Sequence, residues 1–448
     1  MVILMEKKKR KYRLTSAQII VGGFIILILI GTLLLMTPLA SADGVVTPFL
    51  DALFTATSAS CVTGLIVHDT ATYWSTFGKI VIIILIQIGG LGVITTAFLI
   101  RVMMGSKISL VQRTLLQDSI SGDNVHGIVK MSLFILKIVL LTEIGGAALM
   151  APVFIRDFGT AKGICYALFH SVSAFCNAGF DLMGVREKYS SLVSYQGNVV
   201  INLVVCFLIL FGGLGFYTWK DIQDKKFHFS KFNLQTKVVL TTSFLLIVLP
   251  AVLFFVSEYQ GLPLKERVLS SLFQSVTART AGFNTSDLSK FSDNSLVVMI
   301  FLMLIGGSPG STAGGMKTTT IAILAATFFS LAVRRKQTVL FDRRIPESTV
   351  RSALALFLMY VFFFLIGGMM ISGIEGQPLL SCLFETASAI GTVGVTLGLT
   401  PHLHAFSHVI LIVFMFFGRM GGLTFMYAVL KKSRLDSSHL PEEDINVG

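Results

Sequence analysis

The chain has 448 residues, of which 54% are hydrophobic and only 13% are charged, and its formal net charge is +12. Soluble domains carry roughly 25% charged residues, so this composition excludes an ordinary soluble enzyme and is typical of integral membrane proteins. The positive charge lies in short segments between apolar runs, which excludes a nucleic-acid-binding face and is typical of cytoplasmic loops.

The N-terminal segment, residues 1–17, is basic and is predicted to lie in the cytoplasm. Its basic residues, the apolar run that follows and Ala40-Ser41-Ala42 together have the layout of a secretory signal. However, the apolar run at residues 19–36 exceeds the roughly 7–15 residues of a signal core. We therefore expect an uncleaved first membrane helix.

A pattern led by phenylalanine and closed by glycine then recurs four times along the chain. The four copies occupy residues 54–64, 169–179, 273–282 and 384–394, the third being one residue shorter. The closing glycines are separated by 115, 103 and 112 residues, each close to a quarter of the chain. A repeat of this period indicates four structural units of one architecture.

Each copy lies between two apolar segments that can span a bilayer as helices of about 20 residues. The segments before the copies are residues 18–36, 128–152, 236–256 and 352–374, and those after them are 79–104, 198–219, 295–333 and 406–430. The copies themselves are too short to cross, so they are predicted to form re-entrant helices. The backbone that follows them at membrane depth must be buried in protein or line a water-filled cavity.

The chain is thus predicted to be an all-α integral membrane protein. It should have eight transmembrane helices in four helix–pore loop–helix repeats, with pseudo-fourfold symmetry around one pore. The predicted units, in chain order, are residues 18–105 (repeat 1), 128–219 (repeat 2), 236–333 (repeat 3, with a broken second helix), 352–430 (repeat 4) and 431–448 (a cytoplasmic tail).

Four glycine-ended loops around one axis have the chemistry of a cation selectivity filter. Backbone carbonyls can replace the hydration shell of an ion, and glycine allows the backbone conformations that aim them inward. Thr392-Val393-Gly394 matches the first half of the potassium-channel signature TVGYG. The residues predicted to bind K⁺ through their carbonyls are Cys61, Val62, Thr63, Gly64, Cys176, Asn177, Ala178, Gly179, Arg279, Thr280, Ala281, Gly282, Gly391, Thr392, Val393 and Gly394.

The segment 306–315 interrupts the last apolar run of repeat 3 with five glycines and one proline. Such a composition does not stay helical, so we expect either a plain kink or a flexible intramembrane loop below the filter. Lys317 follows this segment and Arg419 lies in the last apolar run. A charge at membrane depth costs roughly 2.5–3.5 kcal/mol, so each is expected to face a cavity or a partner. Either they pair structurally with a carboxylate or with carbonyls, or they place a fixed positive charge at the narrowing.

The distribution of basic residues predicts the orientation. The connections between repeats and the two termini carry 24 of the 36 lysines and arginines, whereas the segments on the side of the short loops carry eight. Both termini are therefore predicted to be cytoplasmic, in a multi-pass protein of the plasma membrane. The outer segments also carry twelve acidic residues, which makes the outer mouth attractive to cations.

These motifs resemble those of the Trk/Ktr/HKT superfamily of cation transporters, and within it the Ktr-type membrane subunit. The resemblance covers nearly the whole chain and rests on residues 51–59, 175–180, 280–284, 310–317, 385–394 and 418–424. It implies K⁺ uptake, often dependent on Na⁺, with no organic cofactor in this chain. It also implies a homodimer in membrane lipid, with one pore per subunit, on a cytosolic ring of nucleotide-binding (RCK-type) regulatory subunits. Relatives that pass Na⁺ often carry serine in the first loop, so Gly64 favours K⁺.

The resemblance further implies that the intramembrane loop is the gate. The residues assigned to it are Gly306, Gly307, Ser308, Gly310, Ser311, Thr312, Ala313, Gly314, Gly315, Lys317 and Arg419. Two alternatives stay open at this point. A Na⁺ or non-selective monovalent cation transporter has the same architecture, and residues 306–310 formally match the GxSxG elbow of a serine hydrolase without its strand–turn–helix context.

Overall fold

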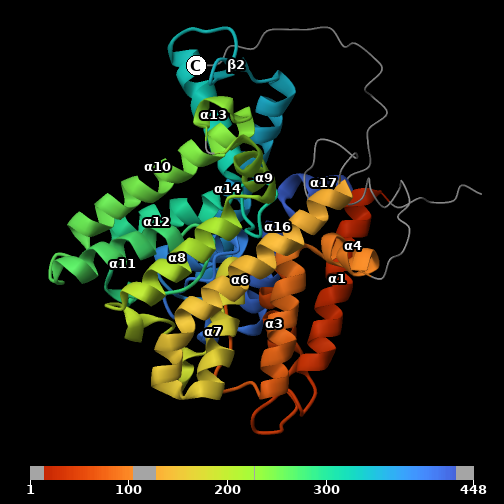
Figure 1. Cartoon of the computed structure of the whole chain (residues 1–448), viewed down its shortest axis with the longest axis vertical. Helices are drawn as coiled ribbons and strands as arrows, with labels where there is room; N and C mark the ends of the chain where they lie inside the picture. The colour runs from red at the N-terminus through yellow and green to blue at the C-terminus, as the bar shows by residue number, and fades with distance from the viewer. Residues whose placement is uncertain (1–14, 104–127, 227, 430–448) are drawn as a thin grey trace, which may run out of the picture.

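The structure, a computed structural model, describes residues 15–103, 128–226 and 228–429. The predictions for the first 14 residues, for the connection at 104–127 and for the tail at 430–448 concern residues outside this description. The described part is almost entirely helical, and Figure 1 shows α10, α11 and α12 on the side of the molecule opposite α1 and α3.

Each quarter of the chain has a long helix, a short helix and a broken or bent helix pair. Repeat 1 comprises α1 (Ser16–Leu35), α2 (Phe49–Ser60), α3 (Thr76–Leu91) and α4 (Val93–Met103). Repeat 2 comprises α6 (Ile128–Phe158), α7 (Thr160–Phe175), α8 (Val199–Gly213) and α9 (Phe216–Lys225). Repeat 3 comprises α10 (Leu234–Ser257), α11 (Leu264–Thr277), α12 (Asp293–Ile305) and α13 (Thr318–Ala332). Repeat 4 comprises α14 (Glu347–Glu375), α15 (Leu379–Gly391), α16 (Ala405–Met420) and α17 (Gly422–Val429).

The long helices α1, α6, α10 and α14 are apolar and long enough to cross a membrane. The three pairs α3–α4, α8–α9 and α16–α17 bend by 99°, 94° and 99°, and α12 and α13 are separated by residues 306–317. The sequence predicted a break only in repeat 3. The other helices turn at Gly92, Gly215 and Gly421, where φ is +87°, +93° and +76°, values that side chains with a Cβ rarely adopt.

The short helices are the buried part of the molecule, although they are rich in serine and threonine. In α2, Thr55, Thr57, Ser58 and Ser60 are all buried. The long helices instead expose large apolar side chains, among them Ile26, Leu33, Leu141, Leu149, Phe244, Leu249, Leu358 and Phe362. A polar centre with an apolar exterior is the arrangement that lipid requires, because backbone irregularity is tolerated only away from lipid.

Prolines mark where three of the short helices begin. Pro48, Pro263 and Pro378 are the N-caps of α2, α11 and α15. Proline has no N–H to leave without a partner and disrupts a helix interior, so it suits the start of a re-entrant helix.

The repeats pack in a closed circle. The helix that follows the loop in each repeat contacts the short helix of the next repeat: α3 contacts α7, α8 contacts α11, and α12 contacts α15. The helix α16 of repeat 4 contacts α2 of repeat 1, which completes the circle.

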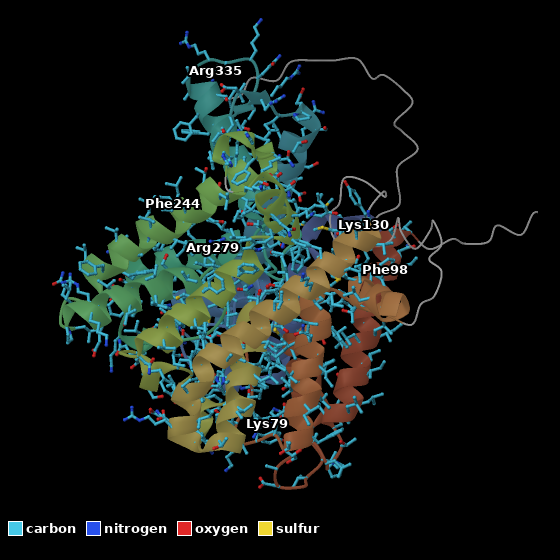
Figure 2. All side chains as sticks on the ribbon, in the orientation of Figure 1. Lys79, Phe98, Lys130, Phe244, Arg279 and Arg335 are labelled. Carbon is cyan, nitrogen blue, oxygen red and sulfur yellow. The ribbon has the colours of Figure 1, made fainter. Side chains whose placement is uncertain are left out.

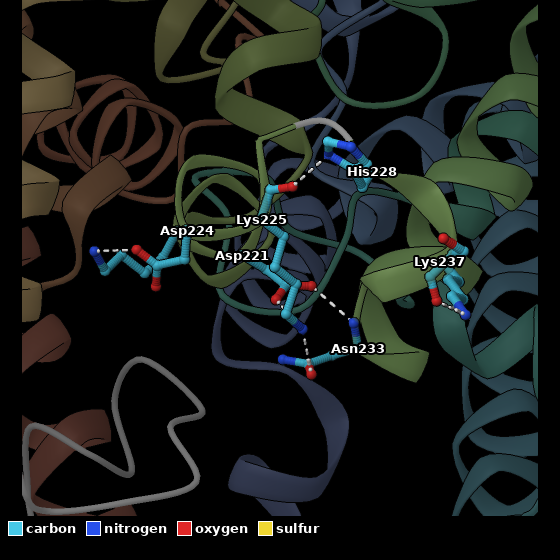
Figure 3. A network of polar contacts seen from close by, with 8 residues as sticks. Asp221, Asp224, Lys225, His228, Asn233 and Lys237 are labelled. Carbon is cyan, nitrogen blue, oxygen red and sulfur yellow. Dashed lines mark hydrogen bonds and ion pairs between the residues drawn. The ribbon is translucent and has the colours of Figure 1, made fainter.

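The two connections between repeats that the structure describes lie close together, with the rings of Phe229 and Phe341 6.2 Å apart. Between repeats 2 and 3, Lys225 pairs with Asp221 at 2.7 Å and donates to Asn233 at 2.8 Å, which joins α9 to the start of α10 (Figure 3). The short 3-10 turn η3 (Phe229–Lys231) lies between them. Between repeats 3 and 4, β1 (Val339–Leu340) pairs antiparallel with β2 (Arg343–Arg344). Figure 2 shows Arg335 beside this hairpin and Lys79, at the start of α3, at the opposite end of the molecule.

Candidate functional site

The four closing glycines meet in cyclic order at the centre of the molecule. A Cβ on Gly64 would lie 2.5 Å from the carbonyl oxygen of Ala178, and one on Gly179 would lie 2.6 Å from that of Ala281. A Cβ on Gly282 would collide with the Val393 oxygen, and one on Gly394 would collide with the Thr63 oxygen. The four glycines have φ between +69° and +92°.

The carbonyl oxygens in this ring accept no hydrogen bond from the part of the chain that the structure describes. Thr63, Ala178, Ala281 and Val393 are buried, and among the described residues no backbone N–H donates to their oxygens. Buried carbonyls are nearly always paired, so four unpaired ones next to each other are unusual. A desolvated cation is a partner that fits this donor-free ring of oxygens.

Each loop is held by the short helix before it. The N–H groups of Thr63, Ala178 and Val393 all donate at 2.8 Å to the carbonyl of the residue five positions earlier. In the shorter third loop, Ala281 donates to Thr277 at 3.0 Å. These bonds turn the N–H groups toward the helix and leave the carbonyls facing away from it.

A hydroxyl side chain at the same position in all four repeats supports the loops. Ser58 and Ser388 accept from the N–H of Gly64 at 3.1 Å and of Gly394 at 3.0 Å. Ser173 and Thr277 donate instead to the carbonyls of Phe180 and Phe283, both at 2.7 Å. Sequence reasoning missed these four residues. The aligned repeats carried the signal, because every copy has a hydroxyl at this position.

A second pair of buried side chains braces the chain just after the loops. His170 in α7 accepts from the N–H of Leu182 at 3.2 Å, and Glu385 in α15 accepts from the N–H of Leu397 at 3.1 Å. Both donors lie three residues after the closing glycine, so equivalent side chains have equivalent roles in repeats 2 and 4.

Four of the predicted filter residues lie at helix ends. Cys61, Cys176 and Thr392 are the C-caps of α2, α7 and α15, and Gly391 is the last residue of α15. Arg279 directs its side chain away from the ring, where Nη2 donates to Ser243 of α10 at 3.3 Å. Figure 2 labels Arg279 in this part of the molecule. Its Nε and Nη1 atoms are buried without a partner.

A cavity of about 620 Å³ opens on one side of the ring, and all four closing glycines line it. Its lining includes the carboxylates Asp181, Glu187 and Asp287 and the amines Lys188 and Lys290. Burial, and secondarily the charge of Asp69, raises the pKa of Asp181 to about 6. The hydrogen bond from Ser289 is the main reason that the pKa of Asp287 lies below its usual value.

On the other side of the ring lies the segment 306–315. Its backbone is tied to repeat 2, with Ser308 N–H donating to Gly213 at 3.0 Å and Phe216 N–H donating to Gly310 at 2.9 Å. Its later part meets repeat 4, where Gly315 N–H donates to Gly418 at 3.1 Å. A Cβ on Gly314 would collide with the side chain of Thr392. The segment therefore packs directly against the filter loops.

The two cations predicted at membrane depth both bind carbonyl oxygens. Lys317 donates to Ala313 at 2.8 Å and to Gly314 at 3.4 Å. Arg419 donates to Gly89 at 2.5 Å, to Gly90 at 2.8 Å and to the carbonyl of Thr312. Neither forms an ion pair with a carboxylate among the described residues. Both cations therefore have the carbonyl partners that the structural alternative allows, and the described residues give them no carboxylate partner.

The glycine doublets that precede the bends have a defined packing role. A Cβ on Gly89, Gly212 or Gly418 would collide with a carbonyl at the end of the short helix in its own repeat. Arg419 takes the place of the second glycine in the doublet of repeat 4. Its guanidinium therefore lies at the same depth as these close contacts between helices, where it donates to the carbonyl of Gly89.

Ser308 does not sit in a hydrolase site. Its hydroxyl pairs with Thr318 at 3.1 Å, and no histidine contacts it among the described residues. The segment also lacks the strand that a nucleophile elbow needs.

Comparisons with known proteins agree with this geometry. The model of the TrkH family, described as cation transport protein, matches residues 3–439. The chain is 41% identical to the potassium/sodium uptake protein NtpJ of Enterococcus hirae, covering 99% of this chain and 100% of that protein. It is 36% identical to the Ktr system potassium uptake protein B of Bacillus subtilis, covering 100% of both.

Among solved structures, the potassium transporter TrkH from Vibrio parahaemolyticus superposes with a TM-score of 0.70 at 21% identity. The match covers 94% of this chain and 87% of that one. This likeness concerns the fold alone. The resemblance inferred from the motifs is confirmed by the family model and the relatives, and the prediction that the chain is not an enzyme is confirmed with it. With its full length matched, the chain belongs to the TrkH family of cation transport proteins.

Proposed function

We propose that this chain carries K⁺ into the cell across the plasma membrane, through a filter formed by its four glycine-ended loops. The observation that carries the proposal is the ring of buried, donor-free carbonyls of Thr63, Ala178, Ala281 and Val393. The circular packing of the four repeats supports pseudo-fourfold symmetry around this single pore and the count of eight spans. The names of the relatives, which are uptake proteins for potassium or potassium/sodium, support K⁺ as the cargo.

Gly64 favours K⁺ over the alternative of Na⁺ or non-selective transport. The test is growth of a K⁺-uptake-deficient bacterial strain at low K⁺, with the chain expressed and with Na⁺ present or omitted. We expect rescue, and we expect Na⁺ to strengthen it, in line with Na⁺-dependent uptake. Rescue that is equal with and without Na⁺ would contradict the Na⁺ dependence, and no rescue at any K⁺ concentration would contradict K⁺ uptake itself.

The gate in this proposal is the segment 306–315 with Lys317 and Arg419. Arg419 holds the carbonyl of Thr312 and two carbonyls of α3, so it fixes the segment under the filter and adds a positive charge there. Removing that charge should reduce the repulsion of an entering cation. We expect Rb⁺ uptake to rise severalfold in Arg419→Ala and in a deletion of residues 310–315.

The matched control is Arg351→Ala, which removes an arginine whose ion-pair partner among the described residues is the exposed Glu347. Its Rb⁺ uptake should equal that of the wild type. If both Arg419→Ala and the deletion also equal the wild type, the segment is not the gate.

The proposed assembly is a homodimer in membrane lipid, with both termini in the cytoplasm and a cytosolic ring of nucleotide-binding subunits below it. The exposed apolar faces of the long helices support contact with lipid. The molar mass of the purified protein in detergent, measured by light scattering, should be that of two chains. Copurification of a nucleotide-binding subunit should depend on the cytoplasmic connections.

A further inference from the structure

Thr312 is the point at which the segment 306–315 is attached most completely. Its N–H donates to Gly212 at 3.2 Å, and its carbonyl accepts from Arg419. Its hydroxyl donates to the carbonyl of Phe175 at 3.0 Å and accepts from Nδ2 of Asn177 at 2.9 Å. Thr312 is fully buried, so every one of these polar groups would lose its partner if the segment moved.

Asn177 joins this attachment to two filter loops. It lies in the loop of repeat 2, is fully buried and has φ of +57°. Its Oδ1 accepts from the hydroxyl of Thr280 in the loop of repeat 3 at 3.4 Å. The orientation of the amide follows from its neighbours. The Phe175 carbonyl can only accept, so the Thr312 hydroxyl proton points to it and Asn177 must present its NH₂ group to Thr312.

The other repeats have no equivalent of this amide. The positions two residues before the remaining closing glycines are Val62, Thr280 and Thr392. Val62 has no polar side-chain atom, Thr280 donates to Asn177 itself, and the hydroxyl of Thr392 has no hydrogen-bond partner among the described residues. The connection is therefore confined to the half of the ring formed by repeats 2 and 3.

We propose that Thr312 and Asn177 form a latch that transmits the position of the segment 306–315 to the filter loops of repeats 2 and 3. Displacement of the segment would then change which ions the filter accepts as well as how fast they pass. This inference rests on the proposed function, in which the ring is the filter and the segment is the gate.

The physical reason is that a buried donor does not stay unpaired. When Thr312 leaves, Nδ2 of Asn177 loses its acceptor, and its other contact is the Phe175 carbonyl at 3.5 Å. Rotation of the amide toward that carbonyl moves Oδ1 relative to Thr280 and loosens the third loop. By linkage, a change in the third loop must also bias the position of the segment.

The test is the ratio of Rb⁺ to Na⁺ uptake in proteoliposomes, measured together with the absolute Rb⁺ flux. Thr312→Val keeps the shape of the side chain and removes both hydroxyl bonds, whereas Thr312→Ser keeps the hydroxyl. We expect Thr312→Val to raise the Rb⁺ flux and to lower the ratio of Rb⁺ to Na⁺ uptake about tenfold, equivalent to about 1.4 kcal/mol. Thr312→Ser should have the wild-type ratio. A Thr312→Val protein with raised flux and an unchanged ratio would overturn the latch.

The matched control is Thr327→Val in α13, which makes the same chemical change far from the filter. Within the described residues its hydroxyl bonds to Ile323 and Thr338, so both flux and ratio should equal those of the wild type. A comparable fall in the ratio in Thr327→Val would show a general effect of losing a hydroxyl in this repeat and would also overturn the latch.

A second variant approaches the latch from the filter side. Thr280→Val removes only the bond to Asn177, and we expect it to raise Rb⁺ flux severalfold because the segment is then held less firmly. Its effect on the ratio should not add to that of Thr312→Val, since both act through one amide. Unchanged flux in Thr280→Val, or full additivity in the double variant, contradicts the latch even if Thr312→Val does not fold. Failure of the filter assignment would show separately, as unaltered ion discrimination in Gly394→Ser.

Discussion

Gly394 illustrates how closely the residues of the ring approach one another. Its Cα lies beside the carbonyl of Thr63 and beside Gly64, and its φ of +92° is one that residues with a Cβ rarely adopt. Both the position and the conformation therefore restrict this site to glycine. Gly398, four residues later, has a similar φ of +89° but no atom within 4 Å of a Cβ. Substitutions at Gly394 and at Gly398 therefore separate the effect of backbone strain from the effect of steric crowding.

We predict that Gly394→Ser and Gly64→Ser each reduce the discrimination between Rb⁺ and Na⁺ by roughly tenfold or more, or about 1.4 kcal/mol. The added side chain must displace a neighbouring carbonyl and so widen the ring. Uptake of the two ions in proteoliposomes measures the effect. Gly398→Ser, which introduces the same strain into open space, should keep the wild-type discrimination. Equal behaviour of all three variants would contradict the assignment of the ring as filter.

The outer carboxylates predict how uptake depends on pH. Since the pKa of Asp181 is about 6, its carboxylate is charged above pH 7 and mostly protonated near pH 5. Acidification should therefore remove one negative charge from the mouth and raise the KM for Rb⁺. One charge at close range contributes about 1 kcal/mol in water, so the change should be about fivefold or less.

The measurement is KM for Rb⁺ from about pH 7.5 to pH 5 in wild type and two variants. Asp181→Asn should have a raised KM at neutral pH and a flatter pH profile. Asp287→Asn is the matched control, because the pKa of Asp287 is lowered and its charge persists over this range. Asp287→Asn should raise the KM for Rb⁺ at every pH and leave the slope of KM against pH as it is in the wild type. If the KM of Asp181→Asn changes with pH as steeply as that of the wild type, a group other than Asp181 titrates.

At the residue scale, the sequence predicted which glycines come together because identical patterns in four repeats indicate identical positions. It did not predict the role of Ser58, Ser173, Thr277 and Ser388, because a serine in an apolar segment has many possible acceptors. The partner of the Arg279 side chain was equally open, since Ser243 lies 36 residues away on another helix. Contacts of this kind depend on the tertiary arrangement.

At the scale of elements, the bent helices turn on single glycines. Gly421 has φ of +76° and ψ of +133°, a region nearly exclusive to glycine, and no atom lies within 4 Å of its Cβ position. A substitution there introduces backbone strain without a steric clash. It therefore isolates the contribution of the bend to stability.

We predict that Gly421→Ala destabilises the protein by about 1–3 kcal/mol, the usual cost of a side chain in such a conformation. Gly22 in the interior of α1 also has no atom near its Cβ position, but its backbone is helical. Gly22→Ala should be neutral or slightly stabilising, because alanine favours helix more than glycine does. Thermal unfolding in detergent distinguishes the two. An unchanged midpoint in Gly421→Ala would show that the bend is not maintained by this residue.

The long helices and the positions of the short helices were predictable from apolar length and repeat alignment. The three bends outside repeat 3 were not. A glycine doublet inside an apolar run is compatible with close helix packing and with a break, and only the φ values distinguish the two. In repeat 3, the proline and five glycines made the break evident from sequence.

At the scale of the whole molecule, the described connection between repeats 3 and 4 and the start of α3 lie at opposite ends. Arg335, beside the β1–β2 hairpin, and Lys79, at the start of α3, mark these ends in Figure 2. The excess of lysine and arginine on the side of the connections predicts that the hairpin faces the cytoplasm. The membrane orientation is thus accessible to labelling.

We predict that a membrane-impermeant maleimide labels Asp43→Cys on intact cells and labels Arg335→Cys only after permeabilisation. Both positions are exposed. The background is Cys165→Ser, because Cys165 is exposed whereas Cys61, Cys176, Cys206 and Cys382 are buried. The reverse labelling pattern would invert the orientation.

The order of the four repeats around the axis could not be predicted from the sequence. Four similar units indicate that a ring can form, but the alignment does not say which unit neighbours which. The circular series of contacts from α3 and α7 through α16 and α2 determines it. The position of Arg419, in α16 but bound to carbonyls of α3 and of the segment 306–315, follows from that order.

The joining of four unlike loops in one polypeptide has a consequence for how such a conduit diverges between lineages. In an assembly of four identical chains, one codon change alters every side of the opening at once. Here Gly64, Gly179, Gly282 and Gly394 each have a codon of their own. With the ring as the proposed filter, ion preference can therefore change one loop at a time, through intermediate values that an assembly of identical chains would not pass through.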